Sequence, residues 1–257
     1  MAPRIGPDGR TVAYALVRRS RDGDGVDLGL LDVESGARRI LAQRLERHVE
    51  SPFILEPLGW SGDGAVVYLV ARCDCGAQPR GLYGADALTG EFVAVQGADQ
   101  VSGSVTLAPD GTRVAYATDD ISIDAGGDLQ RQWPNRVVVL DLASSSARVV
   151  AEPDLPDRFL GPPTWSPDGT RLAFDLGGHS AVDSISSVDV RDGSALPVIE
   201  GAAMAAQQLA WLPGDRFAMS GRPGSAVDIV LRIWDIAGGI WIEIDRAPAI
   251  EIIGWYR

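Results

Sequence analysis

The sequence predicts an all-β fold, a five-bladed β-propeller whose blades are four-stranded antiparallel sheets. The first observation is a segment that ends one strand, passes through a tight Asp-Gly turn and begins a second strand. Five copies recur at a period of about 50 residues, beginning at Ile5, Trp60, Leu107, Trp165 and Trp211. The second observation is another repeated segment downstream of each copy, which supplies the remaining strands. Several short strands repeated at such a period are typical of a propeller.

The turn of the first segment has a recognisable backbone chemistry. In the copy that begins at Trp165, Pro167 presets one backbone angle and Gly169 supplies a left-handed one. We expect the aspartate between them to cap its own turn through bonds from side chain to backbone, which leaves it no catalytic role. The aspartates at this position are Asp8, Asp63, Asp110 and Asp168. We expect the tryptophans of the motif, Trp60, Trp165, Trp211 and Trp255, to pack between blades.

The second repeated segment ends a strand on an aspartate and then turns. These aspartates are Asp32, Asp86, Asp141, Asp189 and Asp235. Glycine stands four residues after the aspartate in four of the copies, and Ser145 takes its place in the third. A last strand follows each turn, for example at residues 37–41 and 91–95. We expect these aspartates to be structural.

The ends of the chain bear on how the array closes. We expect residues 1–257 to form a single domain, and the segment 249–256 to complete the first blade as its innermost strand, which closes the ring and removes exposed strand edges. The alternative is a six-bladed propeller truncated at the start of its sixth blade. The predicted blades are approximately 5–42 plus 249–256, 57–96, 105–151, 163–199 and 207–245.

Composition and charge exclude some classes of function. The net charge is −12 and all 23 basic residues are arginine, which argues against a nucleic-acid partner and suits a basic one. No apolar run is long enough for a membrane span, and Met1–Arg4 is too short for a signal peptide. We expect a monomeric domain that requires no cofactor, and the sequence leaves the compartment open.

The copy Trp165–Phe174 resembles the PD40, or TolB-like, WD40-related propeller repeat, and the resemblance extends over essentially the whole chain. The absence of lysine suggests a high-GC bacterium as the source. The resemblance implies a propeller that binds protein partners, often in the bacterial envelope, and hence an extracytoplasmic or periplasmic location. Gly62 in place of proline and the shortened turn Pro213-Gly214-Asp215 depart from the pattern. The propellers of serine peptidases accompany a Gly-x-Ser-x-Gly elbow, which this sequence lacks.

The two ends of the predicted blades differ. The Asp-Gly and Ser-Gly turns share one end and are regular, so we expect that end to be structural. The connections at the opposite end are long, and we expect them to be irregular and to carry the binding function. They comprise residues 18–27, 43–56, 71–80, 97–104, 118–135, 152–162, 177–184, 200–206 and 221–229.

Arginine and aromatic residues on these connections predict a partner interface, because such side chains are enriched at interaction hot spots. The candidates are Arg72, Arg131, Trp133, Arg158, Phe159, His179 and Arg222. The favoured function is a non-enzymatic scaffold that binds a protein or peptide, including as the interaction or sensor domain of a larger bacterial protein. The alternative is a small hydrolase or lyase with its site at the mouth of the central channel. His48 and His179 fall in different blades, which favours the scaffold.

Two further groups have metal-binding chemistry. The acidic stretch with Asp119, Asp120, Asp124 and Asp128 offers the oxygen ligands that calcium prefers, although it lacks EF-hand spacing and a solvated loop is the simpler interpretation. Cys73 and Cys75 are too close for an unstrained disulfide and lack the second ligand pair of a zinc site. Their redox state stays open.

Overall fold

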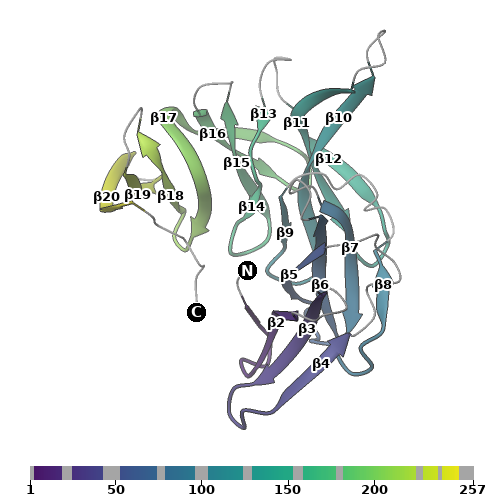
Figure 1. Ribbon diagram of the computed structural model, residues 1–257. Helices are drawn as coiled ribbons and strands as arrows, with labels where there is room; N and C mark the ends of the chain where they lie inside the picture. Colours follow the sequence, from purple (N-terminus) through teal and green to yellow (C-terminus); the bar gives the residue numbers. More distant parts are fainter. Residues whose placement is uncertain are drawn as a thin grey trace. The chain divides into compact units, whose positions relative to one another are not determined.

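The structure is a computed structural model in which every regular element among the described residues is a β-strand (Figure 1). These residues form three four-stranded sheets and one eight-stranded sheet, in which neighbouring strands run antiparallel. The structure describes residues 3–18, 25–42, 53–73, 79–95, 104–123, 129–152, 159–177, 182–223, 228–236 and 239–248.

The first three sheets are blades in which sequential strands lie side by side. The first blade has the order β1 (Arg4–Ile5), β2 (Thr11–Arg18), β3 (Gly25–Asp32), β4 (Arg38–Ala42). The second has β5 (Phe53–Trp60), β6 (Val66–Cys73), β7 (Pro79–Asp86), β8 (Phe92–Ala94). The third has β9 (Val105–Leu107), β10 (Arg113–Ile123), β11 (Leu129–Asp141), β12 (Ala147–Ala151).

The eight-stranded sheet is two blades joined by one long strand. Its strands are β13 (Phe159–Leu160), β14 (Thr164–Trp165), β15 (Arg171–Gly177), β16 (Val182–Asp189), β17 (Ala195–Leu212), β18 (Arg216–Pro223), β19 (Ile229–Asp235) and β20 (Ile240–Ala247). β13 and β14 both pair with β15 and share the innermost position of the fourth blade. The first part of β17 pairs with β16 and its last part pairs with β18, so β17 is the outer strand of the fourth blade and the inner strand of the fifth. The five predicted blades of four antiparallel strands are therefore confirmed.

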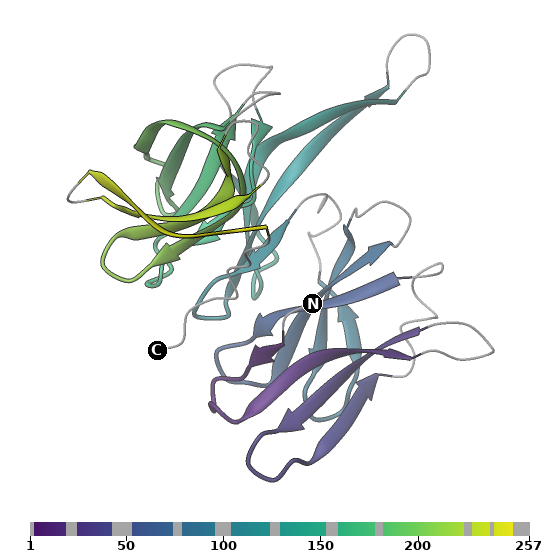
Figure 2. The same cartoon turned by 60° about the vertical axis from the view of Figure 1, so that its left-hand side comes forward.

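Several connections that we expected to be irregular are strands instead. Residues 200–206 lie inside β17, which runs without a break for 18 residues. The insertion 118–135 is largely a hairpin, because β10 reaches Ile123 and β11 begins at Leu129. β10 and β11 are much longer than β9 and β12, and Figure 2 shows this pair of strands extending past its neighbours. The expected closing strand, 249–256, lies outside the described residues.

The glycines of both repeated turns have the left-handed backbone angles that the sequence predicts. Gly9, Gly64, Gly111 and Gly169 have φ of 66–72°. Gly36, Gly90, Gly193 and Gly239 of the second turn have φ of 60–76°. Ser145, which replaces glycine in the third blade, takes φ of 56°.

Neighbouring blades approach each other closely at these turns. A Cβ on Gly111 would lie 2.4 Å from the carbonyl oxygen of Trp60 in the preceding blade. The Trp60 indole Nε1 donates in turn to the Arg4 carbonyl at 3.1 Å, and Trp60 joins Ala13 and Leu30 in a core cluster shared by the first two blades. Trp60, Trp165 and Trp211 are all buried, which confirms their predicted packing role.

Arginines of outer strands also reach the next blade. Arg39 of β4 donates to the carbonyls of Ala87 and Leu88 in the turn between β7 and β8. Arg148 of β12 donates to the Arg191 carbonyl in the turn between β16 and β17, at 3.0 Å. Main-chain acceptors thus link adjacent blades in both parts of the chain.

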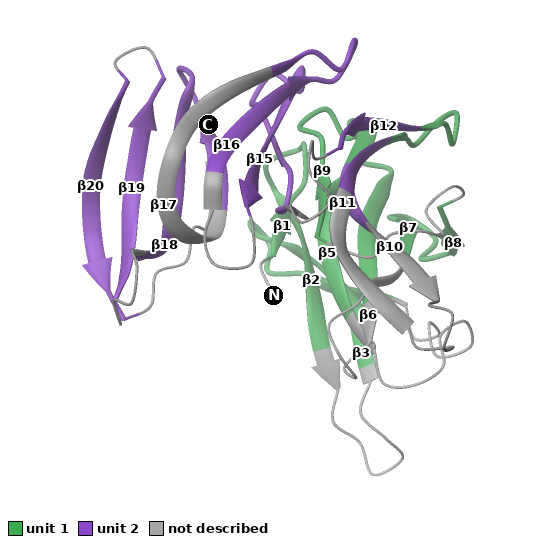
Figure 3. Ribbon diagram, turned by 90° about the horizontal axis from the view of Figure 1, so that it is seen from above, with its two compact units in different colours: residues 1–114, 140–147 green, residues 115–139, 148–257 purple. Residues whose placement is uncertain are grey.

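The chain divides into two compact units, each of which contains complete blades (Figure 3). Unit 1 comprises residues 1–114 and 140–147, and unit 2 comprises residues 115–139 and 148–257. The division runs through the third blade.

Two equivalent glycines give a matched test of this close packing. We expect Gly9→Ala to lower the free energy of unfolding by about 1 kcal/mol, because alanine is strained at positive φ but nothing lies within 4 Å of the new Cβ. Gly111→Ala carries the same strain and also places its Cβ against the Trp60 carbonyl, which adds about 1–3 kcal/mol. Urea unfolding followed by tryptophan fluorescence measures both. Equal losses for the two variants would contradict the inferred role of this contact.

Candidate functional site

Two grooves lie at the Asp-Gly turns, each between one blade and the next. The first groove has a volume of about 440 Å³ and lies between the first and second blades; its lining includes Pro7, Asp8, Arg39, Trp60 and Asp63. The second groove has a volume of about 380 Å³ and lies between the fourth and fifth blades; its lining includes Pro167, Asp168, Arg171, Trp211 and Asp215. We had expected this end of the blades to be only structural.

The two grooves are built from the same parts of the repeat. One wall is the Pro-Asp turn of the preceding blade, Pro7-Asp8 or Pro167-Asp168. The motif tryptophan of the following blade, Trp60 or Trp211, lines each groove together with an aspartate from its own turn. The grooves therefore follow from the repeat and are a product of blade packing.

Most motif aspartates cap their own turns through hydrogen bonds, as we predicted. Asp8 accepts hydrogen bonds from the backbone N–H groups of Arg10 and Thr11, both at 2.9 Å, and from the Thr11 hydroxyl. Asp168 accepts from the Ser166 hydroxyl at 2.6 Å and from the Thr170 N–H at 3.0 Å. These bonds lower the pKa of Asp8 and Asp168, with the Thr11 and Ser166 hydroxyls as the largest causes, so both carboxyls stay ionised.

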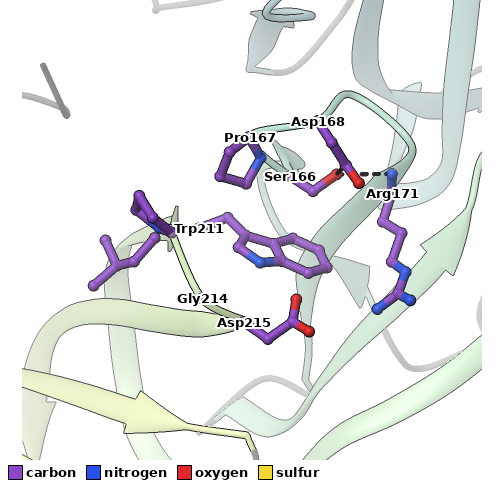
Figure 4. Close-up of a pocket in the computed structure, with 9 residues that line it drawn as sticks. Ser166, Pro167, Asp168, Arg171, Trp211, Gly214 and Asp215 are labelled. Atoms are coloured by element: carbon purple, nitrogen blue, oxygen red, sulfur yellow. Dashed lines mark hydrogen bonds between the residues drawn. The ribbon is translucent and has the colours of Figure 1, made fainter. Parts of the chain in front are cut away.

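The fifth copy of the motif departs from this pattern. Its turn is one residue shorter, and the order Asp-Gly becomes Gly214-Asp215, with φ of 76° and 51°. The carboxylate of Asp215 consequently caps nothing and makes no hydrogen bond or ion pair among the described residues, and neither does the guanidinium of Arg171. Figure 4 draws the Trp211 indole between Pro167 and Asp215, with Arg171 beyond the ring.

One carboxyl is buried away from both grooves. Asp175 lies in β15, is 6% exposed and has no side-chain partner among the described residues. Its carboxyl packs against Gly161, where a Cβ would overlap the Asp175 Oδ1. Burial raises the pKa of Asp175 to about 6. Strand pairing places Ser220 at the equivalent position of the fifth blade, where its hydroxyl is also buried without a partner among the described residues.

Comparisons with known proteins agree on the fold. No protein-family model and no curated protein sequence matches the chain. Solved structures do match it: TolB from Acinetobacter baumannii has a TM-score of 0.61 at 16% identity, with 96% of this chain and 55% of that one covered. An oligogalacturonate lyase in complex with manganese has a TM-score of 0.66 at 18% identity, with 96% of this chain and 65% of the lyase covered. A prolyl endopeptidase has a TM-score of 0.68 at 19% identity, with 95% of this chain and 36% of the endopeptidase covered.

The chain has a TolB-like β-propeller fold. At these identities the likeness establishes the fold alone, and the expected PD40 resemblance is confirmed at that level. The chain spans 55% of the TolB structure and 65% of the lyase, so the activities of those whole proteins do not transfer to it. In the described part of this TolB-like chain, no helix is long and apolar enough to cross a membrane.

The structure describes only some of the residues that we predict to bind a partner. Arg72 lies near the end of β6, and Phe159 begins β13. Arg131 and Trp133 lie on β11, in the long hairpin. Arg222 lies on β18 and is exposed. Arg158 and His179 lie outside the described residues, as does His48, so the predicted interface stays a prediction.

The predicted metal ligands are likewise divided. Asp119 and Asp120 lie on β10, whereas Asp124 and Asp128 fall outside the described residues. Cys73 ends β6, and Cys75 is outside the description. Within the described ranges, no three His, Cys, Asp or Glu side chains are grouped to hold a metal. The calcium expectation is thus untested.

Sequence reasoning missed three side chains of interest. The inverted order Gly214-Asp215 was visible as a departure from the motif, and it could have identified Asp215 as an uncommitted carboxylate. Asp175 could have been found by comparing copies, because strand register places Val70 and Ser220 at its position in two other blades. Arg171 gave no such indication, since an arginine at this point of the turn also occurs in the third copy as Arg113, which pairs with Asp110 at 3.2 Å.

The raised pKa of Asp175 predicts a specific pH dependence. Because the folded pKa is about 6 and the unfolded value is 3.8, the folded state binds more protons between these values. The contribution of Asp175 to stability is therefore fully retained below pH 3.8 and falls as pH rises through 6, by about 3 kcal/mol in all.

We expect Asp175→Asn to be increasingly stabilising relative to the original chain as pH rises from 4 to 7. The measurement is the difference in unfolding free energy between the two proteins across that range. Taking the difference removes the opposite effect of the turn aspartates, which is common to both proteins. A constant difference would show that Asp175 titrates normally.

Proposed function

We propose that the protein is a non-enzymatic propeller scaffold that binds a protein or peptide partner. The main observation behind the proposal is which polar side chains of the second groove have hydrogen-bond partners and which do not. Asp168 is held in its turn by Ser166 and Thr170, while the carboxylate of Asp215 faces the groove without a partner among the described residues. The guanidinium of Arg171, whose charge also acts on its cross-strand neighbour Asp189, lines the same groove. Ionic groups of opposite sign beside a tryptophan suit recognition, because they hold a ligand without transferring a proton.

The long hairpin of β10 and β11 is the second part of the proposed interface. It carries Arg131 and Trp133. β10 and β11 have 11 and 13 residues, whereas β9 and β12 have three and five, so most of each hairpin strand extends beyond its outer neighbour. The edges of a two-stranded ribbon can pair with an added strand from a partner. The proposal extends to the predicted contact residues Arg72, Arg158, Phe159, His179 and Arg222.

A selection experiment tests the proposal. The full chain is immobilised and a random peptide library displayed on phage is enriched against it. We expect a consensus peptide that binds the chain in solution, as measured by fluorescence anisotropy. We expect Trp133→Ala to weaken this binding at least about tenfold if the peptide uses the hairpin, since central aromatic contacts contribute most at interfaces.

The matched control is Arg38→Ala, which changes an exposed residue of β4. A far-UV circular dichroism spectrum verifies that each variant is folded. If no peptide is enriched above background, the scaffold proposal fails. If a peptide binds equally well to Trp133→Ala, the hairpin is excluded as its site.

A lyase or hydrolase is the second candidate, and Asp175 is the observation that favours it. A buried carboxyl with a pKa near neutrality is typical of general acid–base catalysts, and one of the similar structures is an oligogalacturonate lyase with manganese. Incubation with oligogalacturonate and Mn²⁺ tests this candidate. Turnover that Asp175→Asn abolishes would favour the enzyme over the scaffold.

A further inference from the structure

We infer that the outer strand β20 of one copy of the chain packs against the first blade of a second copy, so that copies associate head to tail. The contact is of the kind that already joins neighbouring blades inside each unit. The inference does not depend on the proposed partner-binding function, and it departs from our expectation of a monomeric domain.

Neighbouring blades meet in the same way at two outer strands. Counted from the aspartate that ends the third strand, the ninth residue is Leu41 in the first blade and Val150 in the third. A Cβ on Gly90 of the second blade would meet the Leu41 carbonyl, and a Cβ on Gly193 of the fourth would lie 4.0 Å from the Val150 carbonyl. Leu41 also packs against the core cluster shared by the first two blades, and Val150 is 7% exposed. The outer strand of one blade thus lies against the turn glycine of the next.

The fifth blade carries the projecting half of this contact uncovered. Its ninth residue is Ile244, and β20 has a bulge at the same point of the blade as β4. Ile244 is 53% exposed, where Val150 is buried. Ile240 and Ile242 precede it at alternate positions and are also about half exposed. β20 is the last strand of its sheet, at the edge of unit 2 (Figure 3), so these isoleucines form an apolar stripe on an edge strand.

The first blade carries the receiving half uncovered. Gly36 is its equivalent of Gly90 and Gly193, and among the described residues nothing lies within 4 Å of a Cβ placed there. The residue that follows the turn aspartate is Val33, which is 52% exposed. Val190 stands at the same position of the fourth blade and is 3% exposed. The turn of the first blade therefore presents an apolar side chain and a vacant glycine to a missing outer strand.

The two open halves fit each other because they come from one repeat. With a second copy in place, Ile244 takes the position over Gly36 and Val33 that Leu41 takes over the equivalent turn of the second blade. Both halves are formed within their own units, so the contact needs no rearrangement of either. Burial of the isoleucines favours association, whereas the net charge of −12 on each copy opposes it. Different faces meet in this contact, so each added copy leaves one face of each kind free.

Sedimentation velocity of the full chain tests the inference. We expect the mean mass to rise over about a hundredfold increase in protein concentration, because the contact does not close on itself in a dimer. We also expect added sodium chloride to strengthen the association, since salt screens the repulsion between acidic copies and leaves an apolar contact intact.

Two variants separate the two faces. Ile244→Asp places a charge in the stripe, and Val33→Asp places one in the receiving turn, so each should weaken self-association at least about tenfold. An equimolar mixture of the two should form a dimer, because the intact β20 face of Val33→Asp meets the intact first blade of Ile244→Asp. Ile40→Asp is the matched control, since it makes the same change at an exposed isoleucine of another outer strand, β4, and should associate like the original chain.

Circular dichroism verifies that each variant is folded, and Ile244→Thr, which keeps a β-branched side chain, should weaken association several-fold if Ile244→Asp does not fold. An original chain that stays monomeric at every concentration would overturn the inference. If Ile244→Asp then also lowers the unfolding free energy more than Ile40→Asp, the stripe is covered within the chain, as ring closure requires. A mixture of the two variants that stays monomeric would equally exclude head-to-tail packing.

Discussion

The left-handed glycine of the Asp-Gly turn is the constraint on which the rest of the structure depends, because it acts both within a blade and between blades. Within a blade it lets the chain reverse between two paired strands. Between blades it allows main chain to approach main chain: Gly111 lies against the Trp60 carbonyl, and a Cβ on Gly90 of the other turn would meet the Leu41 carbonyl. At Gly111 and Gly90, the turn therefore limits how closely one blade packs against the next.

The electrostatics of the molecule follow from the same turns. The turn aspartates other than Asp215 are mostly held by nearby N–H and hydroxyl groups. These donors stabilise the charged form, so the repeat leaves a row of ionised carboxylates whose bonding capacity is largely used. Asp175 is the opposite case, since it sits in a strand, has no donor except its own backbone and is therefore destabilised as an anion. Two carboxyls of the same blade, Asp168 and Asp175, thus have pKa values displaced in opposite directions by burial and hydrogen bonding.

The features predicted correctly from the sequence are those encoded locally. The turn glycines, Ser145 in a glycine position and the aspartate caps all follow from residues adjacent in the chain. The packing of the tryptophans, which joins distant segments, was predicted from their recurrence in the repeat. The connections were predicted less well, because strand length depends on pairing with a partner strand that local composition does not specify. Residues 200–206, 118–123 and 129–135 include small and polar residues typical of loops. They are nevertheless strands, because residues 200–206 pair with β16 and β18, and β10 pairs with β11.

The grooves show why departures from a repeat are where function is most readily sought. A turn that follows the motif uses its carboxylate internally, and such a site can attract a ligand but has little capacity left to bind it. Inverting the order to Gly214-Asp215 keeps the hairpin, since both residues accept positive φ, while it releases the carboxylate into the groove beside Trp211. The cost to the fold is small because Leu212 still pairs with Arg216. The departure at Gly214-Asp215 thus leaves a carboxylate without a partner among the described residues, and it does so without loss of strand pairing.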